Sequence, residues 1–585
     1  MGKDRFSTLD SSNRAKPLLP MSLEKDDDQT PAKKSFRDTL LALVRVVPGG
    51  MVVARWIKPN ITYFWTTKQP TLWMAGLIVG AIVGIATIAF RELVGFVQLA
   101  WLRDMSEFVA TAARTQPWWV VLTAPAFGGL IVGLMLEKLM SSRRAFGVAD
   151  VIEARVMSGR NVSVKEGFFS AIISAISLGF GASTGREGPV VHLGATISAF
   201  FSKWLNLAGK PERTLLACGV ASAVSASFNA PIAGVLFAHE VILGHYAATA
   251  FVPIAIASVA GTVLSRIYFG ETAAFLIPDY DITSYWEFPA FALLGLVCAF
   301  VAIAFQASLV GTDWVARNVK MRLLFRPIIG GFMIGFIALF YPEVLGVGYE
   351  ATNLALLGKL SLTTLIALLF AKIIATAITF ASRFGGGVFS PALYLGAMAG
   401  GAFGVIASGI FPDLASSGGV YAILGMGAVA ASVIGAPIST VLIVFELTGG
   451  YEITIALMIT IVISYGLTQA FHGRSFFHWQ LEMRGLFVQD GPHKYLLKYA
   501  RVSEVMQPID EEEEETTFDP ASGETYLRPT DTLEAALRAF DTDGRTRILV
   551  VDSDDATKIV AHLQQVDVLR QFNSALISTS EEEHR

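Results

Sequence analysis

The chain has 585 residues, of which 53% are hydrophobic and only 16% are charged, whereas roughly 25% of the residues in a soluble domain are charged. Of the 94 charged residues (45 basic and 49 acidic), 44 lie in the 414 residues from 71 to 484 and 50 lie in the other 171. This distribution excludes a soluble multidomain enzyme and predicts a membrane region between two aqueous ends, while a net charge of −4 and only two cysteines give no indication of a nucleic-acid partner or a cysteine-rich metal site.

Residues 1–70 are the first predicted segment. They carry twelve Lys or Arg residues against seven Asp or Glu residues, which by the positive-inside tendency predicts a cytoplasmic N-terminus. The first 30 residues include no apolar stretch typical of a cleavable signal peptide, so we expect insertion to use internal spans.

The membrane region, residues 71–484, consists of apolar segments interrupted by glycine and proline. The apolar segments lie near 72–90, 118–136, 167–201, 214–243, 250–268, 288–310, 326–341, 360–381, 391–411, 419–447 and 453–471. Breaks fall inside several of them, as at Gly188-Pro189, Ala230-Pro231 and Ala436-Pro437. Non-helical backbone at membrane depth is tolerated only inside the protein or along a water-lined path, so the breaks indicate a permeation pathway.

The breaks recur in an internal repeat. The segment from Gly185 to Ala195 aligns with the segment from Gly387 to Ala397 at an offset of 202 residues, with Gly, Pro and Leu-Gly-Ala in register. A second block, from Gly219 to Glu240, aligns with the block from Gly425 to Glu446 at an offset of 206. Discontinuous helices in two matched halves, about 71–270 and 285–480, are typical of transporters that bind their substrate at the repeat interface.

Helices that begin inside the membrane favour a small anion as substrate. Their first N–H groups have no intrahelical acceptor, and the positive end of the helix dipole lies there. Glu187 stands in one such helix start, and a carboxylate at membrane depth is a functional candidate by default. We expect Glu187 to act as a gate and proton acceptor, with pairing to the neighbouring Arg186 as the alternative.

These residues resemble the CLC family of chloride channels and chloride/proton exchangers. The resemblance rests on Gly185-Arg186-Glu187-Gly188-Pro189, Gly387-Val388-Phe389-Ser390-Pro391 and the segment from Asn229 to Phe237, and it covers most of residues 72–480. It implies an all-α, inverted-repeat membrane domain that forms a homodimer with one anion pathway per subunit. It also implies that Glu187 is the external gate and that an anion is bound by backbone N–H groups among Arg186, Gly188, Val388, Phe389 and Ser390.

The inner part of the family motif differs in this chain. The family's Gly-Ser-Gly-Ile-Pro motif corresponds to the segment from Ala145 to Ala149, so Phe146, beside Gly147, replaces an anion-facing serine. The family's central tyrosine corresponds to Phe477. We therefore expect an inner constriction of two aromatic rings without hydroxyl donors, with chloride as the first guess for the anion.

A second departure concerns proton coupling. The family's exchangers relay the proton through an inner glutamate, and Val241 occupies that position here after Glu240. Because valine carries no proton, the sequence favours a channel or a weakly coupled conductor, although Glu240 or His239 is a possible substitute relay. The sequence does not decide whether Lys372 and Arg383 attract anions or pair with carboxylates such as Glu446.

Residues 485–585 return to a soluble composition. They predict a capped helix at 530–540, strands at 547–552 and 559–563, and a helix at 566–574, an order that resembles a CBS domain. Asp567 corresponds to the ribose-binding position of such domains, but Gln564 replaces the usual threonine. We expect a structural or dimer-contact role more than adenine nucleotide binding.

The sequence thus predicts a multi-pass protein, α-helical in the membrane with a small α/β tail, that transports chloride or a similar anion and is not an enzyme. The alternatives are a proton-coupled antiporter and a non-conducting sensor that acts through the tail. We expect an inner or plasma membrane location in contact with lipid, cytoplasmic termini, and no metal or other cofactor.

Overall fold

The computed structural model of the protein describes residues 57, 59–62, 64–66, 69–156, 163–270, 275, 282–487, 500–509, 518–519 and 524–584. The chain divides into the compact units Met1–Pro70 and Thr71–Arg585. Residues 1–56, which make up most of the predicted N-terminal segment, lie outside the described residues.

The first half of the helical unit runs from residue 69 to residue 270. Its elements are α3 (Gln69–Leu102), α4 (Val109–Thr115), α5 (Trp118–Leu139), α6 (Val148–Val156), α7 (Val164–Gly179), α8 (Glu187–Trp204), α9 (Lys210–Phe228), α10 (Pro231–Phe237), the π-helical η1 (Ala238–Leu243) and α11 (Ala248–Phe269). Proline at the start of α10 removes an N–H that would have no partner in the helix, which explains why the chain restarts a helix there.

The second half repeats this order between residues 285 and 482. Its elements are η2 (Tyr285–Glu287), α12 (Phe288–Asn318), α13 (Phe325–Phe340), η3 (Pro342–Val344), α14 (Tyr349–Leu356), α15 (Leu362–Ala381), α16 (Phe389–Ile410), α17 (Gly418–Ile434), α18 (Pro437–Thr448), α19 (Tyr451–His472) and α20 (Phe476–Glu482). Proline again begins the short helix, α18, that corresponds to α10.

The lengths of these helices fit a multi-pass membrane protein with broken spans. Seven helical stretches in the described part of the chain are long and apolar enough to cross a membrane. The predicted apolar segments 167–201, 214–243 and 419–447 are each divided into two helices, α7 and α8, α9 and α10, and α17 and α18. The glycine and proline breaks are therefore confirmed as helix ends.

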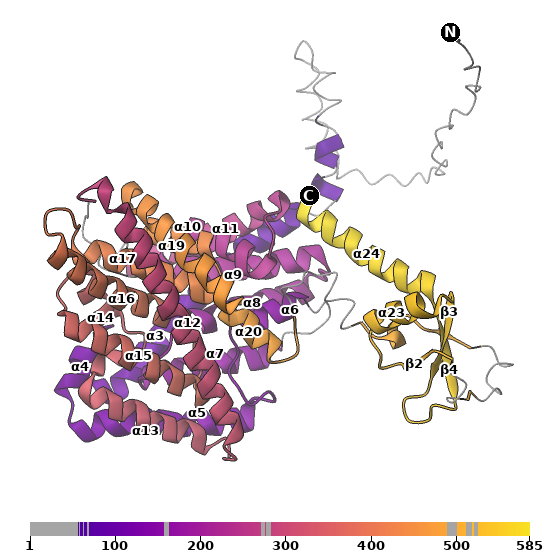
Figure 1. Cartoon of the computed structure of the whole chain (residues 1–585), viewed down its shortest axis with the longest axis horizontal. Helices are drawn as coiled ribbons and strands as arrows, with labels where there is room; N and C mark the ends of the chain where they lie inside the picture. Colours follow the sequence, from indigo (N-terminus) through magenta and orange to yellow (C-terminus); the bar gives the residue numbers. More distant parts are fainter. Residues whose placement is uncertain are drawn as a thin grey trace, which may run out of the picture. The chain divides into compact units, whose positions relative to one another are not determined.

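Glycines at matched positions explain why the two repeats share the Leu-Gly-Ala sequence. Helices α16 and α17 pack closely together (Figure 1), and a Cβ atom on Gly396 would lie 2.2 Å from the carbonyl oxygen of Gly425. In the first half, α8 and α9 pack in the same way, with 2.6 Å from a Cβ on Gly194 to the oxygen of Gly219. Only glycine permits this backbone approach, which places both broken helix starts in the interior.

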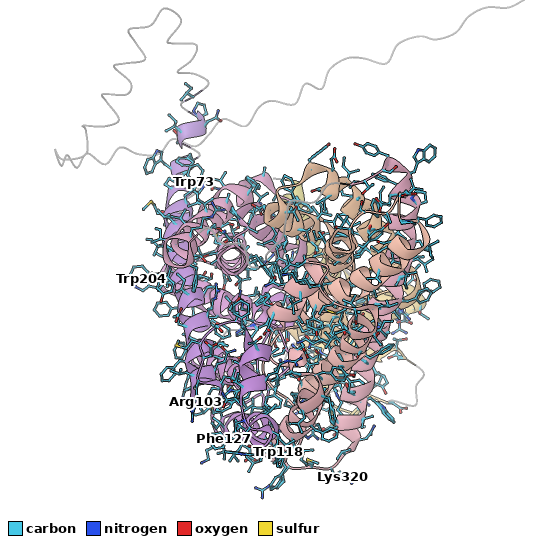
Figure 2. The ribbon with its side chains drawn as sticks, turned by 90° about the vertical axis from the view of Figure 1, so that its left-hand side faces the viewer. Trp73, Arg103, Trp118, Phe127, Trp204 and Lys320 are labelled. Atoms are coloured by element: carbon cyan, nitrogen blue, oxygen red, sulfur yellow. The ribbon has the colours of Figure 1, made fainter. Side chains whose placement is uncertain are left out.

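The outer surface of the helical unit is apolar, as expected against lipid. Large exposed side chains include Trp118, Trp204, Phe300 and Phe336. Figure 2 shows Trp73 near one end of the unit and Trp118 near the other. Tryptophan is enriched where a membrane meets water, so this arrangement fits a membrane-spanning unit.

The C-terminal module has a four-stranded sheet. Its elements are η5 (Val502–Glu504), β1 (Gln507–Pro508), β2 (Tyr526–Leu527), α23 (Leu533–Asp543), β3 (Arg547–Val551), β4 (Ile559–Gln564) and α24 (Gln565–His584), and the strand order is β1-β4-β3-β2. The β2–β3 pair is parallel and the other two pairs are antiparallel. Thr532 caps α23 through its hydroxyl, which accepts from the amide of Ala535 at 3.1 Å. The two predicted strands and two predicted helices are confirmed, and α24 is longer than expected.

Candidate anion-binding site

The two repeat motifs meet at their glycines. The amide of Gly185 donates to the carbonyl of Gly387 at 2.7 Å, and the amide of Gly387 donates to the carbonyl of Gly185 at 2.8 Å. This antiparallel bridge joins residues that are equivalent in the internal repeat, so the two motif segments meet in a locally symmetric way. The bridge brings the N-terminus of α8 beside the N-terminus of α16.

Both helix starts offer free amides. The residues that precede α8 and α16, Arg186 and Val388, form no side-chain cap hydrogen bond. Helix geometry leaves the first amides of each helix without an intrahelical acceptor. Two positive helix ends therefore converge in the protein interior, an arrangement that stabilises a negative charge.

A cavity of about 680 Å³ reaches this point. Most of the site residues predicted from the sequence line it: Phe146, Gly147, Glu187, Gly188, Val388, Phe389 and Phe477. The rings of Phe146 and Phe477 contribute no hydroxyl. The cavity lining does not include Arg186, Ser390, Glu240 or Val241.

Glu187 lies buried at the start of α8, with 4% of its surface exposed. Its Oε1 accepts hydrogen bonds from Ser390 Oγ at 2.5 Å and from Tyr349 Oη at 3.2 Å. Its Oε2 is buried and has no hydrogen-bond partner in the described part of the chain. The carboxylate thus occupies the position that the two helix ends make favourable for an anion, and one of its oxygens is left to take a proton.

Arg186 does not pair with Glu187 in this structure. Its guanidinium donates to Glu107 at 2.7 Å and lies 4.8 Å from the centre of the Tyr349 ring. Glu107 also pairs with Arg91 at 3.0 Å. This network positions Tyr349, which sequence reasoning missed because the tyrosine is 162 residues away from Glu187 and belongs to no recognised motif.

Arginines surround the rest of the cavity. The lining includes seven arginines, Arg143, Arg144, Arg317, Arg322, Arg326, Arg383 and Arg484, and four acidic residues, Glu137, Asp150, Asp313 and Glu187. The excess of positive charge raises the local concentration of anions. Of these arginines, only Arg383 was considered from the sequence, because the members of the cluster come from segments far apart in the chain.

Two aspartates pair with some of these arginines. Arg383 lies 4.0 Å from Asp313, which also pairs with Arg317. Asp150, in α6 and outside the candidate spans, pairs with Arg144 and Arg484. Burial raises the pKa of Asp150, but hydrogen bonding and the charges of these two arginines outweigh burial and lower the pKa to about 2. Asp150 therefore stays ionised throughout the physiological pH range.

Glu240 has a partner that the sequence did not reveal. Its carboxylate accepts from the amides of Ile438 at 3.1 Å and Ser439 at 2.7 Å, at the start of α18. The equivalent residue, Glu446, accepts from the amides of Ile232 at 3.0 Å and Ala233 at 2.8 Å, at the start of α10. Each repeat therefore caps a broken helix of the other.

Val241 has apolar partners, and Lys372 is bound by backbone carbonyls. Val241 packs against the hydrophobic core. Lys372, which the sequence left between two roles, is fully buried, and its Nζ donates to the carbonyls of Val344 at 3.0 Å and Gly346 at 2.9 Å. These carbonyls belong to the loop that leads to Tyr349.

In the C-terminal module, Asp567 makes contacts within the module. Its carboxylate accepts from Gln507 Nε2 at 2.6 Å and from Arg570 at 2.8 Å. Both carboxylate oxygens are therefore engaged. Adenine nucleotide binding at this residue stays an untested prediction.

Comparisons with known proteins agree with this arrangement. The sequence profile of the family described as "Voltage gated chloride channel" matches residues 128–469. A protein of Ralstonia nicotianae named "Putative chloride channel protein ClcB-like" is 31% identical over 67% of this chain and 92% of its own length. The H(+)/Cl(−) exchange transporter ClcA of Cronobacter sakazakii is 29% identical over 70% of this chain and 88% of its own length.

Solved structures show the same fold. A slow cyanobacterial Cl⁻/H⁺ antiporter superimposes with a TM-score of 0.64 at 23% identity, over 71% of this chain and 97% of its own. A CLC-type fluoride/proton antiporter gives a TM-score of 0.57 at 20% identity, over 70% and 97% of the two chains. The inverted-repeat fold, the converging helix ends and the sequence matches agree, and the chain therefore belongs to the CLC family of anion transport proteins.

Proposed function

We propose that this protein exchanges chloride, or a similar small anion, for protons, with Glu187 as both gate and proton acceptor. The observation that carries the proposal is the position of the Glu187 carboxylate where the starts of α8 and α16 converge, with Oε2 unpartnered. The positive ends of the two helix dipoles stabilise an ionised carboxylate there, as they would stabilise a bound anion.

Protonation provides the coupling. An ionised Glu187 competes with the transported anion for the helix ends, because both carry negative charge. A protonated Glu187 loses this attraction and leaves the position. Binding of the anion between the helix ends is therefore linked to protonation of Glu187. Each movement of the side chain then carries a proton one way and permits an anion to move the other way.

Although the Ralstonia relative is named a putative chloride channel, one curated relative and the two superimposed structures support the exchanger over the channel that the sequence favoured. The Cronobacter protein is named an H(+)/Cl(−) exchange transporter, and both superimposed structures are titled proton antiporters. The anion named for them is chloride in two cases and fluoride in the third. Chloride is therefore our first candidate for the anion.

Uncoupled conduction is the second candidate, and Val241 favours it. Valine cannot carry a proton, and the Glu240 carboxylate is bound to the amides of α18. A proton would then need another route from the inner side of the membrane to Glu187.

Reconstitution in liposomes tests the proposal. An outward chloride gradient is expected to drive uphill proton uptake, measured with a pH-sensitive dye alongside a chloride electrode. Chloride efflux without proton movement would support the channel, and the absence of any anion flux would support a sensor. Glu187→Gln is expected to abolish proton uptake and the pH dependence of flux, whereas Glu452→Gln removes an exposed carboxylate outside the cavity and is the matched control.

We also propose that the protein is a homodimer in a cell membrane with both termini in the cytoplasm. The excess of basic residues in 1–70 supports the orientation. Protease protection of tags at the two ends, in sealed inside-out and right-side-out vesicles, tests it. Cross-linking in the membrane tests the dimer.

A further inference from the structure

Two hydroxyl groups point at the same oxygen of the gate carboxylate. Ser390 Oγ, from the first turn of α16, lies 2.5 Å from Glu187 Oε1, and Tyr349 Oη, from the start of α14, lies 3.2 Å from it. Both side chains are buried, with 3% and 4% of their surfaces exposed. Neither comes from the helix that carries Glu187.

Contacts that do not involve Glu187 hold the Tyr349 ring and the Ser390 backbone in place. The centre of the Tyr349 ring lies 4.8 Å from the Arg186 guanidinium and 5.0 Å from the centre of the Phe275 ring, which it meets edge to face. Arg186 is held in turn by its ion pair with Glu107. Ser390 sits in the first turn of α16, one of the two helix ends that favour an anion. Both hydroxyls therefore stay close to this position when the gate side chain leaves.

We propose that Ser390 Oγ and Tyr349 Oη are ligands of the transported anion, which takes the place of Glu187 Oε1 when the gate withdraws. This inference deepens the proposed function and depends on it. A negatively charged carboxylate oxygen that accepts two hydroxyl hydrogen bonds marks the place where another anion can be bound by the same donors. Withdrawal of Glu187 without replacement would leave two buried donors unsatisfied, which is costly.

The hydroxyls of Ser390 and Tyr349 supply the side-chain donors that the inner end of the pathway lacks. Phe146 and Phe477 line the cavity without hydroxyls, so the side-chain donors of this chain are displaced from the inner constriction to the gate. Hydroxyl donors bind charge-dense anions more strongly than diffuse ones. Ser390 and Tyr349 therefore favour chloride over a large, weakly hydrated anion such as thiocyanate.

Removal of the Glu187 carboxylate distinguishes anion binding by the two hydroxyls from a simpler role, in which they only hold the Glu187 side chain in the closed position. In the full-length Glu187→Ala variant, no carboxylate competes, and chloride binding is measured by calorimetry in detergent. Adding Ser390→Ala or Tyr349→Phe to this variant is expected to raise the chloride Kd roughly tenfold each, the loss typical of a hydrogen bond to a charged group. The Kd for thiocyanate is expected to rise less.

Two matched variants control for loss of packing. Tyr394→Phe removes the hydroxyl of a buried tyrosine one turn after Ser390, and that hydroxyl has no hydrogen-bond partner in the described part of the chain. Ser198→Ala removes a buried hydroxyl that donates to the carbonyl of Gly194 within α8. Both are expected to leave the chloride Kd of the Glu187→Ala variant unchanged.

The outcomes keep the inference apart from the proposed function. An unchanged chloride Kd in both hydroxyl variants, or no chloride binding by Glu187→Ala, would overturn the inference even if the wild-type protein exchanges chloride for protons. Failure of the proposed function shows instead in the wild-type liposome assay. An equal rise in Kd for chloride and thiocyanate would refute the selectivity role.

Discussion

The reciprocal capping of α10 and α18 leads to a prediction that distinguishes structure from proton relay. Glu240 accepts from two amides at the start of α18, at 3.1 and 2.7 Å. Its repeat equivalent, Glu446, accepts from two amides at the start of α10, at 3.0 and 2.8 Å. Only Glu240 lies next to the position where a relay acid would stand, so Glu446 is a control built into the same fold.

The expected decrease in the free energy of unfolding follows from the hydrogen bonds that each substitution removes. A hydrogen bond to a charged group contributes about 1.5–3 kcal/mol, and the lower end applies because both side chains are only half-buried. Replacement of Glu240 by Gln keeps one acceptor oxygen and is expected to cost about 1.5 kcal/mol. Replacement by Ala loses both acceptors and is expected to cost about 3 kcal/mol. The same substitutions of Glu446 are expected to cost similar amounts.

Two measurements on the same preparations test this reasoning. Thermal unfolding followed by tryptophan fluorescence in detergent should show Glu240→Gln and Glu446→Gln destabilised to a similar degree. Liposome assays should show the wild-type ratio of protons to chloride for both variants. The capping role would be refuted if Glu240→Gln abolished proton movement without changing the melting temperature, while Glu446→Gln kept the wild-type proton movement and melting temperature.

Three further predictions follow from the packing and from the cavity. Gly425→Ala should prevent normal folding, because its Cβ would lie 2.3 Å from the carbonyl oxygen of Gly396. Gly466→Ala is the control, because a Cβ there meets nothing within 4 Å. Size-exclusion profiles compare the two variants, and a monodisperse Gly425→Ala protein would contradict the close packing. Arg322→Gln should lower chloride flux at low ionic strength and much less at high salt, because salt screens the charge of this exposed arginine of the cavity lining. Lys359→Gln, which removes an exposed charge outside the cavity, is the control. An effect that does not depend on salt would argue against electrostatic attraction of chloride by Arg322. Phe477→Tyr should lower the chloride Kd several-fold in calorimetry by adding a donor to the cavity lining, and an unchanged Kd would place the anion elsewhere.

Much of the fold could be predicted because its signals are local or repeated. Apolar composition predicted the membrane helices. Gly188-Pro189 marked the break now seen between α7 and α8, and two Ala-Pro pairs marked the breaks before α10 and α18. The repeat predicted that Gly185 and Gly387 are equivalent. In the C-terminal module, runs of mostly apolar residues predicted β3 and β4, but β1 and β2 are only two residues long and too short to produce a pattern.

The site itself was predicted only in part. Seven of the predicted residues line one cavity, because the motif segments that contain them are short and stay together at helix starts. The hydroxyls of Ser390 and Tyr349 on the gate, the arginine lining and the partners of Glu240 were not predicted. Each of these is a contact between segments well separated along the chain.

The sequence by itself determined the kind of protein and the positions of the broken helices, and it singled out Glu187 as the candidate gate. The tertiary structure decided which groups meet at the gate. Tyr349 is 162 residues from Glu187, and Ile438 is 198 residues from Glu240. Composition and periodicity describe neighbours along the chain, whereas these partners meet only because the two halves pack against each other.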